Sequence, residues 1–219
     1  MIFDLDQTLV DRTATFQRFL EQQRLRFQNS LTGISRDLFV STIQHYDANG
    51  YTPKREVYAL ACNEWGLELW HELHADFEEI YGQEPVLFSG VKEVLQTLKA
   101  HYKLGLITNG RSRSQNAKME NAGIREFFSA IKVSEEEGVK KPNPIIFERC
   151  LGQLGVAPSQ AVYIGDHPEN DVLAAQKVGL RAVWVQNARY PEPDGADGTV
   201  DNLSELLDLL ETLPFKPTP

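Results

Sequence analysis

The chain has 219 residues, of which 42% are hydrophobic and 24% charged, with a formal net charge of −9 and a pI near 5.1. This length and composition exclude a disordered or fibrous protein and predict a folded chain with room for one domain and a smaller inserted one. The acidic balance argues against a nucleic-acid polymer as partner, because such binding depends on clustered Lys and Arg, but it allows a small anionic ligand.

The two cysteines and the apolar runs bear on the cellular setting. Cys62 and Cys150 lack the paired spacing of a zinc or redox motif, so we interpret them as buried structural thiols. No apolar run approaches the length of a membrane span, and the first residues lack the basic start and long apolar stretch of a signal peptide. We therefore expect a cytoplasmic protein without a membrane partner, either a monomer or a homodimer.

Short runs rich in Val and Ile alternate with longer segments of helical periodicity, a pattern typical of βαβ units. Each run ends where polar residues or glycine begin, and the predicted strands are residues 1–3, 104–107, 130–133, 161–164 and 182–185. The first strand is so short that we expect its start to fray. The pattern as a whole predicts an α/β fold, with a Rossmann-like, mostly parallel sheet flanked by helices.

Helices are predicted between the strands from apolar residues at helical spacing, as in residues 91–98 and 145–150. Asn202 as N-cap and Glu205 three residues later predict a capping box at the start of the last helix. The apolar positions of that helix are Leu206, Leu209, Leu210 and Leu213.

Residues 12–84 break the alternation, because they show helical patterns and aromatic side chains but no convincing strand. Turn residues at 32–33, 49–50 and 52–53 would separate the helices of a small bundle. We therefore expect a catalytic core of residues 1–11 and 85–219, and an inserted helical cap domain of residues 12–84.

The strongest chemical indication is Asp4-Leu5-Asp6-Gln7-Thr8, directly after the first predicted strand. The carboxyl ends of strands are where open α/β sheets bind ligands. Alternation along an extended chain would put Asp4 and Asp6 on one side, close enough to share a metal ion. Asp and Thr are also common turn and cap residues, so the motif alone has a plain structural explanation.

Two further polar segments follow predicted strands. Thr108-Asn109-Gly110 offers a hydroxyl and loop amides for phosphate oxygens, and Lys141, beside Pro142, offers a compact positive charge. Taken singly, the first segment is more typical of a turn, and the second is more typical of a solvated basic pair before a helix.

The fourth predicted strand leads into Gly165-Asp166-His167-Pro168-Glu169-Asn170-Asp171. Carboxylate oxygens next to a phosphate site favour Mg²⁺. Asp171 has a second interpretation as the cap of the following helix. All these elements stand at strand ends in an order that would bring them to one crevice, which favours a shared site over chance.

On Asp4-x-Asp6-x-Thr8, Thr108, Lys141 and Gly165-Asp166 with Asp171, the chain resembles the haloacid dehalogenase superfamily. The resemblance spans almost the whole chain. The insertion is similar to the helical cap of the subfamily that includes phosphoglycolate phosphatases, nucleotidases, β-phosphoglucomutase and the dehalogenases. One departure is Gln7, where the family commonly has glycine.

The resemblance implies that Asp4 is the nucleophile of an aspartyl-phosphate, while Asp6 protonates the leaving oxygen and later activates water. It implies Mg²⁺ held by the Asp4 carboxylate, the Asp6 backbone carbonyl and Asp166, with Asp171 binding through water or orienting Lys141. Thr108 and Lys141 would stabilise the transition state. The loop residues that would help bind the phosphate are Leu5, Thr8, Asn109 and Gly110.

We therefore expect a Mg²⁺-dependent phosphatase for a small phosphorylated metabolite, namely a nucleotide, a sugar phosphate or phosphoglycolate. A phosphomutase of the β-phosphoglucomutase type and a catalytically silent binding protein with the same fold are the alternatives. A dehalogenase is disfavoured, because those relatives lack an acid at the position of Asp6.

Two predictions concern the insertion. His71 and His74 stand three apart, whereas a zinc-protease helix needs them four apart, so we reject a zinc site there. Side chains expected to reach the substrate are Phe16, Arg18, Phe19 and Tyr46, although packing within the bundle explains the aromatic ones equally well.

Overall fold

The computed structural model describes residues 1–212, so Leu213 of the predicted last helix and the proline-rich residues 214–219 lie outside the described residues. The chain divides into two compact units. The first comprises Met1–Arg12 and Pro85–Pro219, and the second is Thr13–Glu84. The first division falls one residue later than the predicted one, because Arg12 groups with the first unit.

The first unit is built on a six-stranded parallel sheet with strand order β3-β2-β1-β4-β5-β6. The strands are β1 (Ile2–Phe3), β2 (Gly105–Thr108), β3 (Ala130–Val133), β4 (Val162–Gly165), β5 (Arg181–Val185) and β6 (Gly198–Val200). The predicted Rossmann-like α/β fold is confirmed. Strand β6 was not predicted, since it starts with glycine and only Val200 of its three residues is buried.

Strand β1 is the centre of the sheet, so the expected fraying of its start is wrong. Ile2 and Phe3 pair with β2 on one side and β4 on the other, and neither is exposed to solvent. Two residues suffice here because both edges of the strand are hydrogen-bonded and both faces are covered. The position of β1 matters for the site, since the chain leaves its carboxyl end at Asp4.

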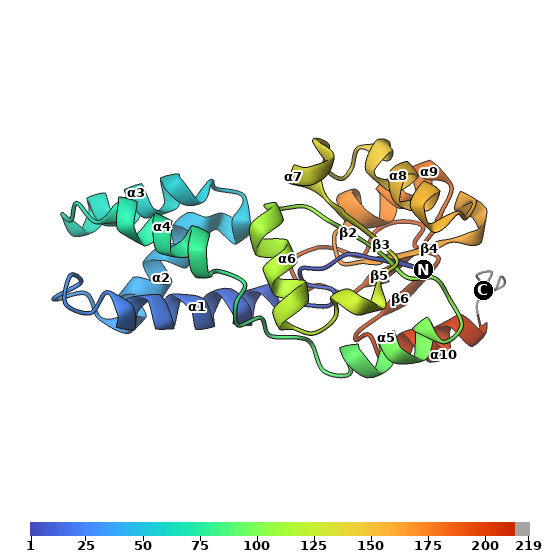
Figure 1. Ribbon diagram of the computed structural model, residues 1–219, viewed down its shortest axis with the longest axis horizontal. Helices are drawn as coiled ribbons and strands as arrows, with labels where there is room; N and C mark the ends of the chain where they lie inside the picture. Colours follow the sequence, from blue (N-terminus) through green and yellow to red (C-terminus); the bar gives the residue numbers. More distant parts are fainter. Residues whose placement is uncertain (213–219) are drawn as a thin grey trace. The chain divides into compact units, whose positions relative to one another are not determined.

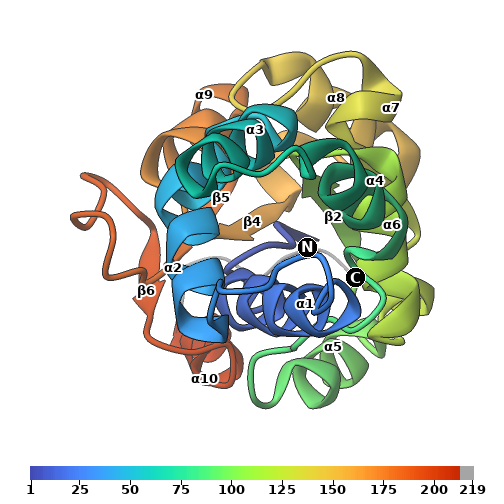
Figure 2. The ribbon, with the colours of Figure 1, turned by 90° about the vertical axis from the view of Figure 1, so that its left-hand side faces the viewer.

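Helices cover both faces of the sheet (Figures 1 and 2). One face packs against α5 (Val91–Lys99), α6 (Ser112–Asn121) and α10 (Glu205–Thr212), which share one apolar cluster with the strands. The other packs against α8 (Pro144–Leu154) and α9 (Ala174–Val178). The remaining short segments are α7 (Ser134–Glu137), η2 (Arg125–Phe127), η3 (Pro158–Gln160) and the π-helical η4 (Pro168–Leu173).

The last helix begins with a capping arrangement near the predicted one. The Oδ1 atom of Asn202 accepts from the backbone N–H of Ser204 at 3.1 Å. Glu205 reaches back to the backbone N–H of Asp201 at 2.9 Å, one residue before the predicted N-cap. Ser204 and Asp201 both precede Glu205, where α10 begins, so these bonds satisfy backbone donors of the turn that leads into the helix.

The second unit is helical. Its helices are α1 (Arg12–Arg26), α2 (Arg36–Asp47), α3 (Lys54–Trp65) and α4 (Trp70–Ile80), with a short η1 (Ala48–Gly50) after α2. Breaks between helices fall at the predicted turns and also at Gly66, which ends α3 in a left-handed conformation at φ 66°. An apolar cluster that includes Phe16, Phe39 and Tyr58 fills the space between the helices.

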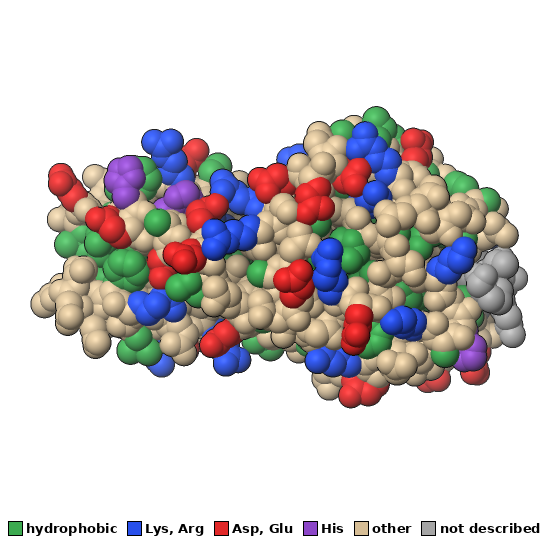
Figure 3. All heavy atoms as spheres, in the orientation of Figure 1, with side chains coloured by type: hydrophobic (Ala, Val, Ile, Leu, Met, Phe, Trp, Pro, Cys, Tyr) green, Lys and Arg blue, Asp and Glu red, His purple; other side chains and the backbone are tan. Residues whose placement is uncertain are grey.

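The surface and the helices carry two further observations. On the face seen in Figure 3, basic and acidic side chains are interspersed, which is typical of a solvated surface. Within residues 1–212 no helix combines the length and apolar character needed to cross a membrane.

Candidate active site

Four strand ends bring the predicted site residues to one edge of the sheet. Asp4 follows β1, Thr108 ends β2, Lys141 lies beyond β3 and α7, and Asp166 follows β4. Because β1 lies between β2 and β4, the chain connections diverge there to opposite sides of the sheet. Such a switch point leaves a crevice at the carboxyl ends of the strands.

Lys141 links two of the predicted acids. Its Nζ atom lies 2.6 Å from Oδ1 of Asp4 and 2.7 Å from Oδ1 of Asp171. All three side chains are buried. Burial by itself would lower the pKa of Lys141, but the carboxylates of Asp171 and Asp4 outweigh that effect and raise it. The lysine is therefore held as a cation.

Asp171 is an acceptor within this network and not the cap of its helix. Its Oδ1 atom also lies 3.1 Å from the hydroxyl of Tyr163, and its Oδ2 accepts from the backbone N–H of His167 at 3.0 Å. The capping role belongs to His167, whose Nδ1 accepts from the backbone N–H groups of Glu169 and Asn170. The interpretation of Asp171 as helix cap is therefore wrong.

Asp4, Asp166 and Asp171 form a buried carboxylate cluster. One carboxylate oxygen of each lies within 4.8 Å of the others, a spacing suited to a shared cation. Burial raises the pKa of Asp4 well above its ordinary value, and the neighbouring Asp171 and Asp166 add to the effect despite Lys141. Burial, followed by Asp171, raises the pKa of Asp166 to about 7. Without a bound cation, simultaneous ionisation of the three carboxyl groups is therefore disfavoured.

The donor set fits a hard divalent cation. Three carboxylates and the single ammonium of Lys141 leave a formal charge of −2 in a buried space. All the candidate ligands are oxygens, which Mg²⁺ prefers over nitrogen or sulfur. Asn187 steadies one ligand, because its Nδ2 atom donates to Oδ2 of Asp166 at 2.6 Å.

The carboxylate of Asp6 does not join this cluster. It lies instead against Lys118, whose Nζ is 2.7 and 2.8 Å from its two oxygens. The expected alternation fails because β1 ends at Phe3 and the chain turns, with Gln7 at a left-handed φ of 65°. The prediction that the Asp4 and Asp6 side chains share a metal ion is therefore wrong. Binding of the ion by the Asp6 backbone carbonyl stays a prediction.

The residues predicted to bind phosphate have different surroundings. Thr108 is buried and lies 2.5 Å from the amide nitrogen of Gln115. The side chain of Asn109 bonds to the backbone N–H and carbonyl of Lys141, so it fixes the loop that carries the lysine. The backbone N–H of Gly110 already donates to Ser134 at 2.9 Å, which does not favour phosphate binding by Gly110.

The other two predicted phosphate-binding residues are in the loop after β1. Leu5 is fully buried and packs in the cluster beneath α5 and α10, so only its backbone is open to a binding role. Thr8 is also buried, and its hydroxyl has no hydrogen-bond partner among the described residues.

Sequence reasoning missed Gln115, Lys118, Tyr163 and Asn187. Tyr163 sits within a correctly predicted strand, but its hydroxyl partners lie elsewhere in the chain. Gln115 and Lys118 stand three apart on α6, which is a spacing that places them on one helix face. Nothing in that local pattern indicates which face of α6 is buried.

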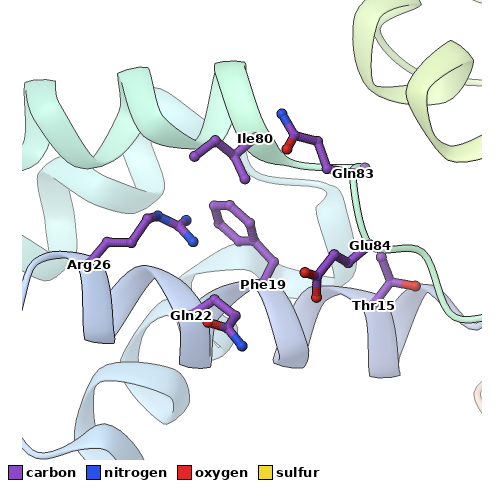
Figure 4. A pocket seen from close by; sticks show the side chains of 8 residues that line it. Thr15, Phe19, Gln22, Arg26, Ile80, Gln83 and Glu84 are labelled. Carbon is purple, nitrogen blue, oxygen red and sulfur yellow. The ribbon is translucent and has the colours of Figure 1, made fainter. Parts of the chain in front are cut away.

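The helical unit has a pocket of its own, of about 90 Å³, between α1 and the segment that ends α4 (Figure 4). Arg26, which lines it, is bound to Asp76 through Nε and Nη2 at 2.8 and 2.6 Å. The charge of Arg26 is therefore already matched within the bundle.

The side chains expected to reach a substrate are engaged within the helical unit. Phe16 and Phe19 are buried and pack edge-on against Tyr81, so packing explains both aromatic residues. Arg18 pairs with Glu84 at 2.7 Å. The hydroxyl of Tyr46 donates to Glu64 at 2.8 Å.

The remaining candidates are the two cysteines and the histidines of α4. Both cysteines are free and buried, as predicted. His74 lies 3.5 Å from Glu78, its neighbour one turn along the helix. Among the described residues, the carboxylate cluster is the one group of three or more His, Cys, Asp and Glu side chains with the spacing of a metal site.

Comparison with known proteins places the chain in a family. The model of the haloacid dehalogenase-like hydrolases matches residues 1–185, which is most of the chain. The chain belongs to this family. The predicted resemblance to phosphatase-like members of the superfamily is confirmed, and the protein is a hydrolase.

Individual relatives cover nearly the whole chain. Pyrimidine 5'-nucleotidase YjjG of Escherichia coli is 30% identical over 96% of both chains. A HAD phosphatase structure from Thermococcus onnurineus has a TM-score of 0.69 at 25% identity, covering 99% of this chain and 98% of that one. A 2-haloacid dehalogenase structure from Pseudomonas syringae has a TM-score of 0.66 at 27% identity, covering 96% of each. The same fold therefore serves phosphatases and dehalogenases.

Proposed function

We propose that this protein is a Mg²⁺-dependent phosphatase that hydrolyses a small phosphomonoester through an aspartyl-phosphate on Asp4. The observation that carries the proposal is the buried contact of Asp4 with Lys141, 2.6 Å apart, inside the cluster completed by Asp166 and Asp171. A carboxylate beside a fixed cation and a metal site is suited to attack an anionic phosphate, because the positive charges offset the repulsion.

In the first half of the reaction, an oxygen of Asp4 attacks phosphorus. The bond between phosphorus and the leaving alcohol oxygen breaks, and that oxygen takes a proton from the Asp6 carboxyl group. In the second half, water attacks the aspartyl-phosphate and gives a proton to Asp6. Inorganic phosphate leaves, and the Asp4 carboxylate is restored.

Two side chains and the backbone of two loop residues would stabilise the charge that develops on the phosphate oxygens. Lys141 supplies an ammonium that Asp4 and Asp171 already orient. Thr108 supplies a hydroxyl at the end of β2, and the backbone of Leu5 and Asn109 lies on the neighbouring loops. Asn109 acts mainly by holding the Lys141 loop, given its two hydrogen bonds to that backbone.

Mg²⁺ would be held by Asp4 and Asp166, with the Asp6 backbone carbonyl as a further ligand and Asp171 acting beside them. When bound, the ion supplies charge neutralisation between the acids and the phosphate. Asn187 holds Asp166 in place for this role.

The presence of Asp6 favours phosphate transfer over carbon–halogen cleavage. Hydrolysis of a phosphomonoester needs a group that gives and takes a proton at the leaving oxygen, whereas displacement of halide does not. The helical unit is proposed as the cap that selects the substrate. The full-length match to a pyrimidine 5'-nucleotidase puts nucleoside 5'-monophosphates first among the candidate substrates.

Phosphate release by the purified protein tests the proposal. The substrates are p-nitrophenyl phosphate and a panel of nucleotides, sugar phosphates and phosphoglycolate, each with Mg²⁺ and with EDTA. We expect Mg²⁺-dependent release of inorganic phosphate that Asp4→Asn abolishes. Persistent activity in Asp4→Asn, or no release from any substrate, would contradict the proposal.

The same assays separate the alternatives. A phosphomutase would interconvert hexose phosphates and need a bisphosphate activator, with little phosphate released. A silent binding protein would bind a phosphorylated ligand without forming a beryllofluoride or phosphate adduct on Asp4. A dehalogenase would release halide from 2-haloacids.

A further inference from the structure

Asp6 is held by two buried side chains of one helix. Lys118 donates to both carboxylate oxygens of Asp6, at 2.7 and 2.8 Å. Gln115 donates from Nε2 to Oδ2 of Asp6 at 3.0 Å. Lys118 also donates to Oε1 of Gln115 at 2.8 Å, so the two residues fix each other as well as the acid.

This arrangement is costly to build, which argues that it serves a function. Lys118 and Gln115 are each only 2% exposed. A lysine is rarely this buried, since removing its ammonium from water costs several kcal/mol before its partner compensates. A well-packed apolar residue is often at least as good for stability. Lys118 is the buried charged side chain of α6, and it faces Asp6, the proposed acid–base residue.

The bonds leave Asp6 oriented yet still open to water. Three hydrogen bonds from two side chains restrict rotation of the carboxylate, while the Asp6 side chain keeps 20% of its surface exposed. The amide nitrogen of Gln115 also lies 2.5 Å from the hydroxyl of Thr108, so one side chain supports both the proposed base and a proposed phosphate ligand. The ammonium of Lys118 stabilises the charged carboxylate of Asp6, which is the form that can accept a proton from water, although it also makes that carboxylate a weaker base.

We propose that Lys118 and Gln115 are positioning residues that hold Asp6 to take the proton from the water that attacks the aspartyl-phosphate. The inference rests on the proposed phosphatase function. In the step concerned, the water oxygen bonds to phosphorus, its proton passes to Asp6, and the bond between phosphorus and the Asp4 oxygen breaks. Lys118 and Gln115 take no part in bond making and serve to fix the acceptor.

The test separates the two halves of the reaction in Lys118→Met with p-nitrophenyl phosphate and Mg²⁺. Breakdown of the aspartyl-phosphate limits kcat when it is slow, whereas kcat/KM reports only the steps up to its formation. We expect kcat to fall by about 10²-fold, KM to fall in proportion, and kcat/KM to change by less than about 3-fold. The first half of the reaction is spared with this substrate, because p-nitrophenolate is a good leaving group that needs no proton from Asp6. A burst of p-nitrophenol and an acid-stable phosphoenzyme should accompany the change.

Two further variants make the result specific. Lys118→Arg keeps the charge and donors and should recover most of the lost kcat. Lys103→Met removes a lysine of the same unit whose Nζ donates to the backbone carbonyl of Leu154, and it should leave all the kinetic values unchanged. Circular dichroism and thermal midpoints show whether each variant folds.

The outcomes distinguish a failure of the positioning role from a failure of the proposed phosphatase function. If the wild-type protein turns over and folded Lys118→Met keeps its kcat, or loses kcat and kcat/KM equally without phosphoenzyme, the positioning role is overturned alone. If Lys118→Met does not fold, the same measurements on Gln115→Met decide between these results. If the wild-type protein forms no phosphoenzyme and releases no phosphate, the proposed function falls and this inference with it.

Discussion

Gly165 and Asp171 lie so close that a Cβ atom on Gly165 would be 2.5 Å from the carboxyl carbon of Asp171. Strand β4 ends at this glycine, and the space beside it is occupied by the acid that bonds to Lys141. The absence of a side chain at 165 is therefore what allows Asp171 to reach the carboxylate cluster. Any larger residue must displace it.

Gly165→Ala should disturb the site through this contact. Overpacking of a buried position typically costs about 1–3 kcal/mol of unfolding free energy, and displacement of Asp171 should also loosen Lys141. We expect a lower midpoint in urea and weaker Mg²⁺ binding by calorimetry. Gly152→Ala in α8 is the matched control, because no atom beyond its chain neighbours and the backbone of its own helix lies within 4 Å of the added Cβ. That variant should be neutral or more stable by up to about 1 kcal/mol, and an equal loss in both would contradict the role of Gly165.

The stabilisation by Mg²⁺ should depend on pH. Burial raises the pKa of Asp166 to about 7 from an ordinary value of 3.8, so between these values the folded protein binds a proton that the unfolded chain has released. This group therefore makes the metal-free protein less stable as pH rises through that window. Because Mg²⁺ competes with the proton, its effect on Tm should be larger at pH 8 than at pH 5. Differential scanning fluorimetry measures both shifts.

Asp166→Asn is the control for that experiment. It removes both the ligand charge and the titration, so the pH dependence of the Mg²⁺ effect should shrink with the effect itself. A Tm shift that is equal at the two pH values in the wild-type protein would show that Asp166 does not bind the ion.

Lys141→Met should destabilise the protein strongly. It leaves the carboxylates of Asp4 and Asp171 buried without their shared cation, and loss of one partner of a buried ion pair costs about 3–5 kcal/mol. Urea unfolding without metal measures the change. Arg18→Met provides the contrast, because Arg18 and Glu84 are more than half exposed and such pairs are worth about 0–1 kcal/mol. Similar losses in the two variants would argue against a buried pair at Lys141.

Gln7 allows a comparison of two opposing effects. Its left-handed φ of 65° costs a residue with a side chain about 1–2 kcal/mol, which glycine avoids. Its Oε1 atom accepts from the backbone N–H of Arg12 at 3.1 Å, at the start of α1. Gln7→Ala loses this bond and keeps the strain, whereas Gln7→Gly loses the bond and relieves it. Gln7→Gly should therefore be the more stable variant by about 1 kcal/mol in thermal unfolding, and the reverse order would contradict the strain.

Much of the site was predictable because a residue that directly follows a parallel strand lies at a known edge of the sheet. Asp4, Thr108 and Asp166 each stand where an apolar run ends, and the carboxyl ends of parallel strands share one edge of the sheet. The fold class follows from the same alternation of strand and helix patterns. Strand β6 was not predicted, because a strand of three residues at the edge of a sheet has too little apolar pattern to be recognised.

The sequence by itself determined which strand ends carry acids, a hydroxyl and a lysine, and hence that one edge of the sheet holds the chemistry. Only the tertiary structure decided how those charges pair. It placed Lys141 between Asp4 and Asp171, and it turned Asp6 away from the carboxylate cluster to Lys118. The reason is physical: strand order follows from periodic patterns along the chain, whereas the partner of a buried charge depends on which helix face packs inward, and a polar helix such as α6 does not record that in its spacing.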